Sequence, residues 1–505
     1  MLQPTDANAD RSIEDRFFTT SHLHADLKGR SIRGGAVMLA AQVVKFAIQL
    51  ASTAILARLL MPADFGIVAM VTAFTGLLWM LGDMGLASAT IQRAEITHKQ
   101  VSTLFWINIG FSLLISAVVA SLAPVIAWFY HEPRLTMVTL VLAGPFVFSG
   151  LTNQHYALLT RQMRFNAMAL VQTLPQLVSA LVAIGLAKAG WHYWALVLNG
   201  IVGGGVTVLL AWVASGWRPA WPSRCAGVGS MLGFGGHLMC YNLLTYFTRN
   251  TDNVLIGRFL GSGPLGIYSK AYALLIFPVQ QINAPVNGVV LPALSRLQGQ
   301  PDSYRRFFLR AVEGVAFIGM PIIVFAFVDA RLLVLTLLGP NWLGAVEIFR
   351  LLAPAALVGT ISSAPEWIFT SLGKTNRLLL WAAISSPIIL AGFTVGLKWG
   401  AAGVAASFSI TFTLCFALFI IDACRQSPVR LRDFALVLSP PFIVSAAAAL
   451  IVNFAGHLLH FHSAARLFID AVLFSVAYSA LCLVFKGGRR MWKLVLTQVG
   501  VSGHE

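Results

Sequence analysis

The chain has very few charged residues. Of its 505 residues, 11% are charged and 57% are hydrophobic, whereas an ordinary soluble domain carries about 25% charged residues. Negative charge is the scarcer kind, with 19 Asp and Glu against 35 Lys and Arg. The five cysteines are an odd number without metal-ligand spacing, so we expect reduced packing residues and no metal site. These shortages exclude a soluble globular protein.

Sequence signatures of soluble enzymes are also missing. The chain has no Walker sequence for ATP, no GxSxG nucleophile elbow and no HExxH zinc motif. The connections between its apolar runs are short, and none could fold as a catalytic domain outside a membrane. We therefore predict a protein that is not an enzyme and that needs no cofactor.

Long apolar runs are present almost everywhere. About 20 mostly apolar residues cross a bilayer as a helix, and runs of that kind recur along the whole chain. The sequence therefore predicts an all-α polytopic membrane protein with about fourteen transmembrane helices. The expected spans are 35–57, 65–87, 104–129, 135–159, 167–188, 191–215, 230–256, 264–294, 311–329, 345–371, 378–397, 401–423, 434–455 and 466–486.

The net charge of +16 is explained by membrane orientation. With the N-terminus placed in the cytoplasm, most Lys and Arg residues fall in cytoplasmic segments, which is the bias that sets topology. Both termini are then expected to be cytoplasmic, and part of the positive charge is expected to attract anionic membrane lipids. A nucleic-acid binder would concentrate its basic residues on one soluble face. No soluble domain is available here, so we expect no nucleic-acid partner.

The chain contains an internal repeat with an offset of 200 positions. The segment ILARLLMPADFGIV at 55–68 is echoed by LIGRFLGSGPLGIY at 255–268. Two similar bundles that enclose a site are typical of membrane transporters. Each half has an even number of spans, so we expect parallel repeats. The predicted domains are an N-terminal cytoplasmic tail (1–30), a first six-helix lobe (31–215), a linker (216–229), a second six-helix lobe (230–423), two extra helices (424–486) and a C-terminal tail (487–505).

Polar residues follow one face of the first span and the equivalent face of the seventh. Their spacing of three or four residues is that of a helix face. Because charge in a bilayer is costly, such residues usually face an interior or water. We predict that both faces line one central cationic cleft, suited to a phosphate or pyrophosphate group. The predicted binding residues are Gln42, Lys45 and Gln49 in the first half, Asn242, Tyr246, Arg249, Asp252 and Asn253 in the second, and the additional basic residues Lys270 and Arg350.

Two of the basic residues also have a structural interpretation. Arg249 could pair with Asp252, and Arg350 with Glu347, each one helical turn away. Lys45 has no acidic residue within a turn.

Asp83 and three prolines leave further alternatives open. Asp83, near the cytoplasmic end of the second span, could bind a coupling ion or make an ordinary helix-end interaction. Pro278, Pro285 and Pro292 recur every seven residues in the eighth span, where each invites a kink. A helix bent in this way either borders a cavity or faces lipid.

Several segments resemble a known family. ARLLMPADFG, GDMGLASATIQR, RQMRFNAMAL, TDNVLIGRFLGSGPLGIYSKAYAL and LPALSRLQ, between 57 and 298, are similar to segments of Wzx-like polysaccharide exporters. These exporters belong to the multidrug/oligosaccharidyl-lipid/polysaccharide (MOP) exporter superfamily. The resemblance covers about residues 30–425.

The resemblance implies a flippase of the bacterial inner membrane. Its cargo would be an undecaprenyl-pyrophosphate-linked oligosaccharide repeat unit for exopolysaccharide or O-antigen biosynthesis, moved by alternating access. Polysaccharide polymerase and export machinery are candidate partners. The alternatives are a MATE-like drug/cation antiporter and a flippase for the lipid-linked cell-wall precursor. The antiporter would favour carboxylates over basic residues inside the membrane, and the spans show the reverse.

Overall fold

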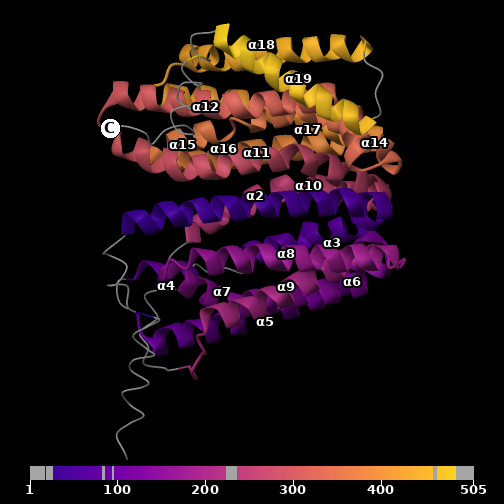
Figure 1. Cartoon of the computed structure of the whole chain (residues 1–505), viewed down its shortest axis with the longest axis vertical. Coiled ribbons are helices and arrows are strands. Elements are labelled where there is room, and N and C mark those ends of the chain that lie inside the picture. The colour runs from indigo at the N-terminus through magenta and orange to yellow at the C-terminus, as the bar shows by residue number, and fades with distance from the viewer. Residues whose placement is uncertain are drawn as a thin grey trace, which may run out of the picture. The chain divides into compact units, whose positions relative to one another are not determined.

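The computed structural model describes residues 18, 27–81, 86–93, 96–222, 236–458, 463–484 and 489. Within these residues the secondary structure is helical, with no strand (Figure 1). The chain forms two compact units, Met1–Cys240 and Tyr241–Glu505. The finer domain bounds expected from the sequence stay a prediction.

The first unit is a bundle of long helices linked by short turns. One of the two longest, α5, begins at a capping box in which the side chains of Thr97 and Gln100 each accept a hydrogen bond from the other's backbone N–H. Glycine in the left-handed region, Gly190 at φ +83°, allows the tight turn between α8 and α9. The helices are α2 (Leu27–Leu59), α3 (Pro62–Leu81), α4 (Leu86–Gln92), α5 (His98–Tyr130), α6 (Arg134–Leu142), α7 (Gly144–Arg161), α8 (Phe165–Lys188) and α9 (Tyr193–Ser215).

The second unit repeats this plan and adds two helices. Its buried core lies where α11, α12, α15, α17 and the start of α18 meet, around Phe308, Phe369 and Trp367. The elements are α10 (Gly236–Leu260), α11 (Ser262–Arg296), α12 (Pro301–Val328), α13 (Ala330–Leu337), η3 (Pro340–Trp342), α14 (Leu343–Gly359), α15 (Ser363–Ser371), α16 (Thr375–Gly396), η4 (Leu397–Trp399), α17 (Gly400–Arg425), α18 (Leu431–Leu458) and α19 (Ser463–Val484).

Equivalent helices pack in equivalent ways in the two units. In the first unit α8 packs on α9, α7 on α9 and α5 on α7; in the second, α16 packs on α17, α14 on α17 and α12 on α14. The fourth span of each half is also broken. The first break separates α6 from α7 at Ala143, and the second separates α14 from α15 near Thr360. The repeat seen in sequence is therefore a repeat of packing within each unit.

The prediction of an all-α polytopic membrane protein is confirmed, and the number of spans agrees roughly with the expected fourteen. Eleven helical runs in the described part of the chain are long and apolar enough to cross a membrane, or twelve if the bent α11 is one span. One run, Thr375–Arg425, contains both α16 and α17, and the polar α10 is not among them. Counting α11 as one span gives twelve. Counting α16 and α17 separately and adding α10 then gives the fourteen expected spans.

Some details differ from the sequence prediction. Helix α13 is a short helix in an expected loop, and the last part of the second span, at 82–85, lies outside the described residues. The expected kink in the eighth span is present as a 42° bend between Ile276 and Pro278 in α11.

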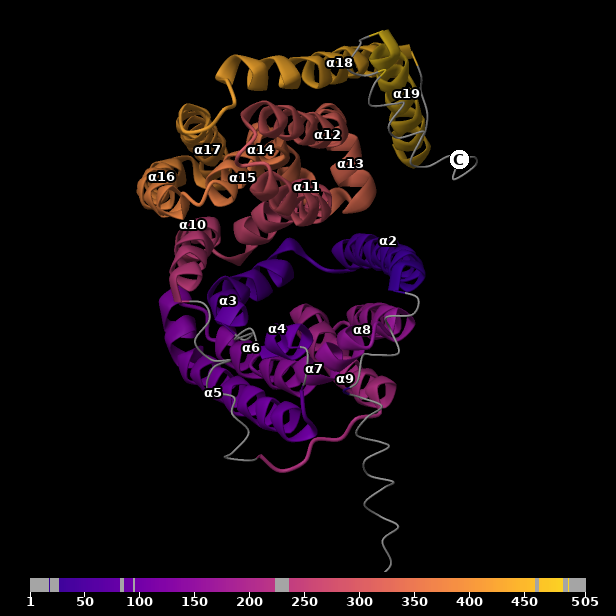
Figure 2. The same cartoon turned by 90° about the vertical axis from the view of Figure 1, so that its left-hand side faces the viewer.

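Helices α18 and α19, outside the duplication, pack against α12 in the same unit (Figure 2). Phe474 and Tyr478 of α19 lie against Phe325 and Phe317 of α12. The Tyr478 hydroxyl donates a 2.8 Å hydrogen bond to the Phe317 carbonyl. Both added helices also carry large exposed apolar side chains, such as Phe454 and Phe468, as expected for helices whose outer face meets lipid.

Candidate functional site

The polar face of α2 is mostly accessible. Gln42 and Gln49 are exposed, and Lys45 between them is half-buried. Gln49 is held by α8, because its Oε1 accepts a 2.7 Å hydrogen bond from Gln176 Nε2. Ser52, at the end of the face, is buried. The α2 face therefore offers one cation and two amides at the surface of the first unit.

Where its side chains are described, the equivalent face of α10 has the same pattern of exposure. Arg249, which aligns with Gln49, is exposed, and Asp252, which aligns with Ser52, is buried. The Asp252 carboxylate accepts hydrogen bonds from the Tyr268 hydroxyl and the Asn253 backbone N–H, both at 2.7 Å. Asp252 is thus a packing residue between α10 and α11. Its burial does not support the prediction that it is an accessible binding residue.

The remaining α10 candidates are placed less fully. Tyr246 is half-buried and its carbonyl accepts from Asn250 Nδ2 at 3.0 Å. Asn253 is half-buried, with its Oδ1 buried and without a hydrogen-bond partner in the described structure. Asn242 lies in α10, but its side chain is outside the described residues, and Asp83 is wholly outside them.

The structural interpretation of the two arginines is not supported. Among the described residues no ion pair joins Arg249 to Asp252, nor Arg350 to Glu347. Arg350 and Glu347 are both exposed on α14. Lys270 is half-buried on α11, between Tyr268 and Tyr272, whose rings stack 6.3 Å apart. The α2 and α10 faces belong to different units, and the cleft that they share stays a prediction.

Two of the segments that resemble the exporter family contact each other, and a third contacts the end of another helix. Arg161, in RQMRFNAMAL, is buried and donates from Nη1 to the carbonyls of Thr90 and Arg93, in GLASATIQR. In the second unit Gln298, at the end of LPALSRLQ, donates from Nε2 to the Ser371 carbonyl. Orphan carbonyls at helix ends need such donors. The motifs therefore fix the ends of helices, which explains their residue types without a ligand.

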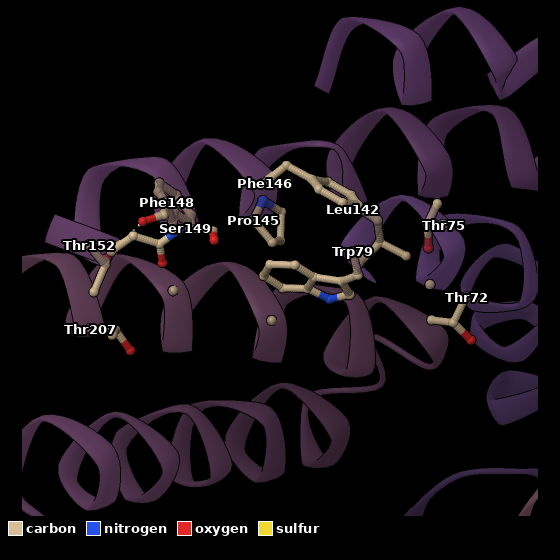
Figure 3. Close-up of a pocket in the computed structure, with 14 residues that line it drawn as sticks. Thr72, Thr75, Trp79, Leu142, Pro145, Phe146, Phe148, Ser149, Thr152 and Thr207 are labelled. Carbon is tan, nitrogen blue, oxygen red and sulfur yellow. Dashed lines mark hydrogen bonds between the residues drawn. The ribbon is translucent and has the colours of Figure 1, made fainter. Parts of the chain in front are cut away.

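A cavity that the sequence analysis missed lies within the first unit. It has a volume of about 450 Å³ and lies between α3, α7 and α9. Figure 3 shows the Trp79 indole beside Pro145, with Thr72 and Thr75 toward one end and Ser149, Thr152 and Thr207 toward the other. The three- and four-residue spacing of Thr72, Thr75 and Trp79 was the available signal. Gly200 and Gly204 of α9 also line this cavity.

Comparison with known proteins identifies relatives along most of the chain. The chain is 26% identical to the teichuronic acid biosynthesis protein TuaB of Bacillus subtilis (strain 168), over 80% of this chain and 84% of that protein. It is 24% identical to the lipopolysaccharide biosynthesis protein WzxC of Escherichia coli (strain K12), over 85% and 88%. It is also 24% identical to the succinoglycan biosynthesis transport protein ExoT of Rhizobium meliloti (strain 1021), over 87% and 90%.

Solved structures share the fold at low sequence identity. A lipid II flippase MurJ in an inward closed conformation matches with a TM-score of 0.68 and 13% identity, over 90% of this chain and 98% of that one. An inward-facing multidrug resistance MATE family transporter of the MOP superfamily matches with a TM-score of 0.60 and 12% identity, over 76% and 94%. A family model described as polysaccharide biosynthesis protein matches residues 55–347. The chain therefore belongs to this family of polysaccharide biosynthesis proteins, and it shares the fold of the MurJ flippase and of the MATE transporter, in agreement with the sequence resemblance.

Proposed function

We propose that the protein is a flippase for oligosaccharide repeat units linked to undecaprenyl pyrophosphate. The repeat units would serve exopolysaccharide or O-antigen biosynthesis in a bacterium, and the membrane would be the inner one. The family supports this proposal, since its relatives are named for teichuronic acid, lipopolysaccharide and succinoglycan biosynthesis. The fold shared with a lipid II flippase is consistent with it.

The observation that carries the proposal is the pair of repeat-related polar faces with accessible cations. A charged side chain near mid-bilayer costs about 2.5–3.5 kcal/mol on insertion scales, and therefore usually serves a function. Lys45 and Arg249 occur on equivalent helices, and neither is joined to an acidic side chain by an ion pair among the described residues. Arg249 could bind a pyrophosphate oxygen pair in bidentate fashion, and Lys45 could add a point charge.

Transport needs no covalent step in this scheme. The pyrophosphate is attracted to Lys45 and Arg249 in a cytoplasm-open state, while the polyprenyl tail remains in lipid. Rocking of the two repeats then exposes the head group to the opposite side, the alternating access typical of duplicated transporters. The polymerase and export proteins that use the repeat unit are proposed partners.

The double substitution Lys45→Ala and Arg249→Ala tests the basic faces. In a host lacking the chromosomal gene, we expect it to abolish surface polysaccharide while the protein remains at normal abundance in the membrane. Lipid-linked repeat units should accumulate, because synthesis continues and export does not. The matched control is Lys188→Ala with Arg331→Ala, which removes two exposed basic residues at helix ends away from both faces.

The outcome separates the candidate functions. A normal amount of surface polysaccharide in the double variant of Lys45 and Arg249 would show that these residues do not belong to the binding site. If deletion of the gene itself left polysaccharide unchanged but altered sensitivity to cationic drugs, the antiporter alternative would replace the flippase.

A further inference from the structure

The cavity in the first unit has an uncharged lining, unlike the two basic faces. Its fourteen lining residues include six with a hydroxyl or amide side chain and none with a charge. We propose that this cavity binds a neutral sugar ring of the repeat unit, apart from the pyrophosphate. The inference rests on the proposed flippase function and assigns the glycan its own subsite within one repeat.

The indole of Trp79 provides the surface on which a sugar ring can stack. Its side chain is 50% exposed although it lies in a membrane-spanning helix. Phe146, which is buried, holds it from one side with ring centroids 5.1 Å apart. The negative face of an aromatic ring attracts the weakly positive C–H groups on one face of a pyranose. Trp79 is thus fixed in place while part of its ring stays available.

Hydroxyl groups around the indole can receive the hydroxyls of the sugar. Thr75, Thr152 and Thr207 each donate to the carbonyl four residues earlier, at 3.2, 2.7 and 2.7 Å. Each oxygen therefore retains acceptor capacity toward the cavity. Ser149 and Asn153 add a hydroxyl and an amide, and among the described residues neither side chain makes a hydrogen bond. A sugar needs such a mixture of acceptors and donors.

Glycines of α9 create the space. A Cβ on Gly204 would lie 2.4 Å from Cδ2 of Phe148, so glycine is required where α9 approaches α7. A Cβ on Gly200 would meet nothing within 4 Å, so this residue faces the open part of the cavity. The volume of about 450 Å³ lies within the range of about 300–1,000 Å³ for small-molecule sites.

The lining also argues against two other parts of the cargo. A pyrophosphate group would be desolvated here without a compensating cation, which is unfavourable. A polyprenyl tail would cover the hydroxyls of Ser149 and Thr207 and the amide of Asn153 without replacing their hydrogen bonds to water. A neutral sugar satisfies both the aromatic and the polar parts of the lining.

Binding of a lipid-free saccharide to the purified full-length protein tests the inference. The probe is the oligosaccharide released by mild acid from the host's own lipid-linked repeat units, titrated in detergent by calorimetry. We expect binding to the wild type, and at least a tenfold weaker affinity for Gly200→Phe, which fills the cavity. Trp79→Ala should weaken binding to a similar extent, whereas Trp79→Phe should retain part of it.

The matched control is Gly205→Phe. It makes the same change on the same helix, its Cβ also meets nothing within 4 Å, and Gly205 does not line the cavity. We expect its affinity to equal that of the wild type. Thermal unfolding identifies any variant that fails to fold. If Gly200→Phe does not fold, the double variant Thr207→Val with Trp79→Phe provides the test. We expect its affinity for the saccharide to be at least tenfold weaker than that of the wild type.

The subsite and the proposed flippase function fail in different ways. The double variant Lys45→Ala with Arg249→Ala should no longer bind the intact lipid-linked precursor, but it should still bind the free saccharide. Wild-type protein that binds the precursor but not the saccharide at millimolar concentration would overturn the subsite, as would equal affinities for Gly200→Phe and Gly205→Phe. Wild-type protein that does not bind the precursor would overturn the flippase function.

Discussion

At the scale of single residues, the structure assigns different roles to neighbours on the same helix face. The sequence pattern places Arg249 and Asp252 together, one turn apart. The structure separates them, because Arg249 is exposed while Asp252 is buried and bonded to Tyr268. A buried acceptor that loses its donor is expensive, so the Asp252–Tyr268 pair is expected to stabilise the packing of α10 on α11.

Substituting Tyr268 tests this role. Tyr268→Phe removes the donor from the buried carboxylate and is expected to destabilise the protein by about 1–3 kcal/mol. The thermal unfolding temperature in detergent should fall accordingly. The control is Tyr272→Phe, which makes the same change one turn away, at a ring that stacks on Tyr268 and lies tilted against Phe408. Equal effects of both substitutions would remove the special role of Tyr268.

The residue scale also shows where sequence reasoning ends. The repeat and the helix spacing predicted which positions share a face. The structure agrees with this prediction, because Gln49 and Arg249 are both exposed and Ser52 and Asp252 are both buried. Periodicity carries no information on which neighbour covers a side chain. The Tyr268 hydroxyl and the Trp79 cavity therefore required the packing of separate helices to be known.

At the scale of elements, apolar run length predicted the helices well because a bilayer requires about 20 apolar residues per crossing. It could not predict the breaks at Ala143 and Thr360, since both lie inside continuous apolar runs. The short helix α13 was missed because it is too short to span. The length of an apolar run also does not tell where two helices cross closely, although small residues are the usual means of achieving such crossings.

The hairpin between α16 and α17 provides the clearest such crossing. A Cβ on Gly403 would lie 2.2 Å from the carbonyl oxygen of Gly396 and 2.7 Å from Cβ of Trp399. We expect Gly403→Ala to push the two helices apart at a cost of about 1–3 kcal/mol. Folded yield and unfolding temperature measure the effect.

The control for this element is Gly185→Ala in α8. A Cβ there meets nothing within 4 Å, and alanine favours a helix by roughly 1 kcal/mol over glycine. We expect Gly185→Ala to be neutral or stabilising. A neutral Gly403→Ala would show that the hairpin tolerates a wider crossing.

At the scale of the whole molecule, composition and charge distribution say more than any motif. Scarcity of charge predicted a multi-pass membrane protein, and the family and the helices confirm that class. The orientation in the membrane is a separate matter. It rests on the distribution of Lys and Arg alone, because cytoplasmic segments retain basic residues during insertion. In the proposed function, the flippase takes up newly made cargo on its cytoplasmic side.

Cysteine labelling can establish the orientation. The described cysteines, Cys415, Cys424 and Cys482, are buried and free, and all five native cysteines would first be replaced by alanine. Two exposed positions then receive single cysteines: Pro222→Cys between the repeats and Lys398→Cys in the turn after α16. In cells with a permeabilised outer membrane, an impermeant maleimide should label Lys398→Cys and leave Pro222→Cys unlabelled until the inner membrane is opened. The reverse pattern would invert the topology, and Lys45 and Arg249 would then have to attract cargo from the opposite leaflet.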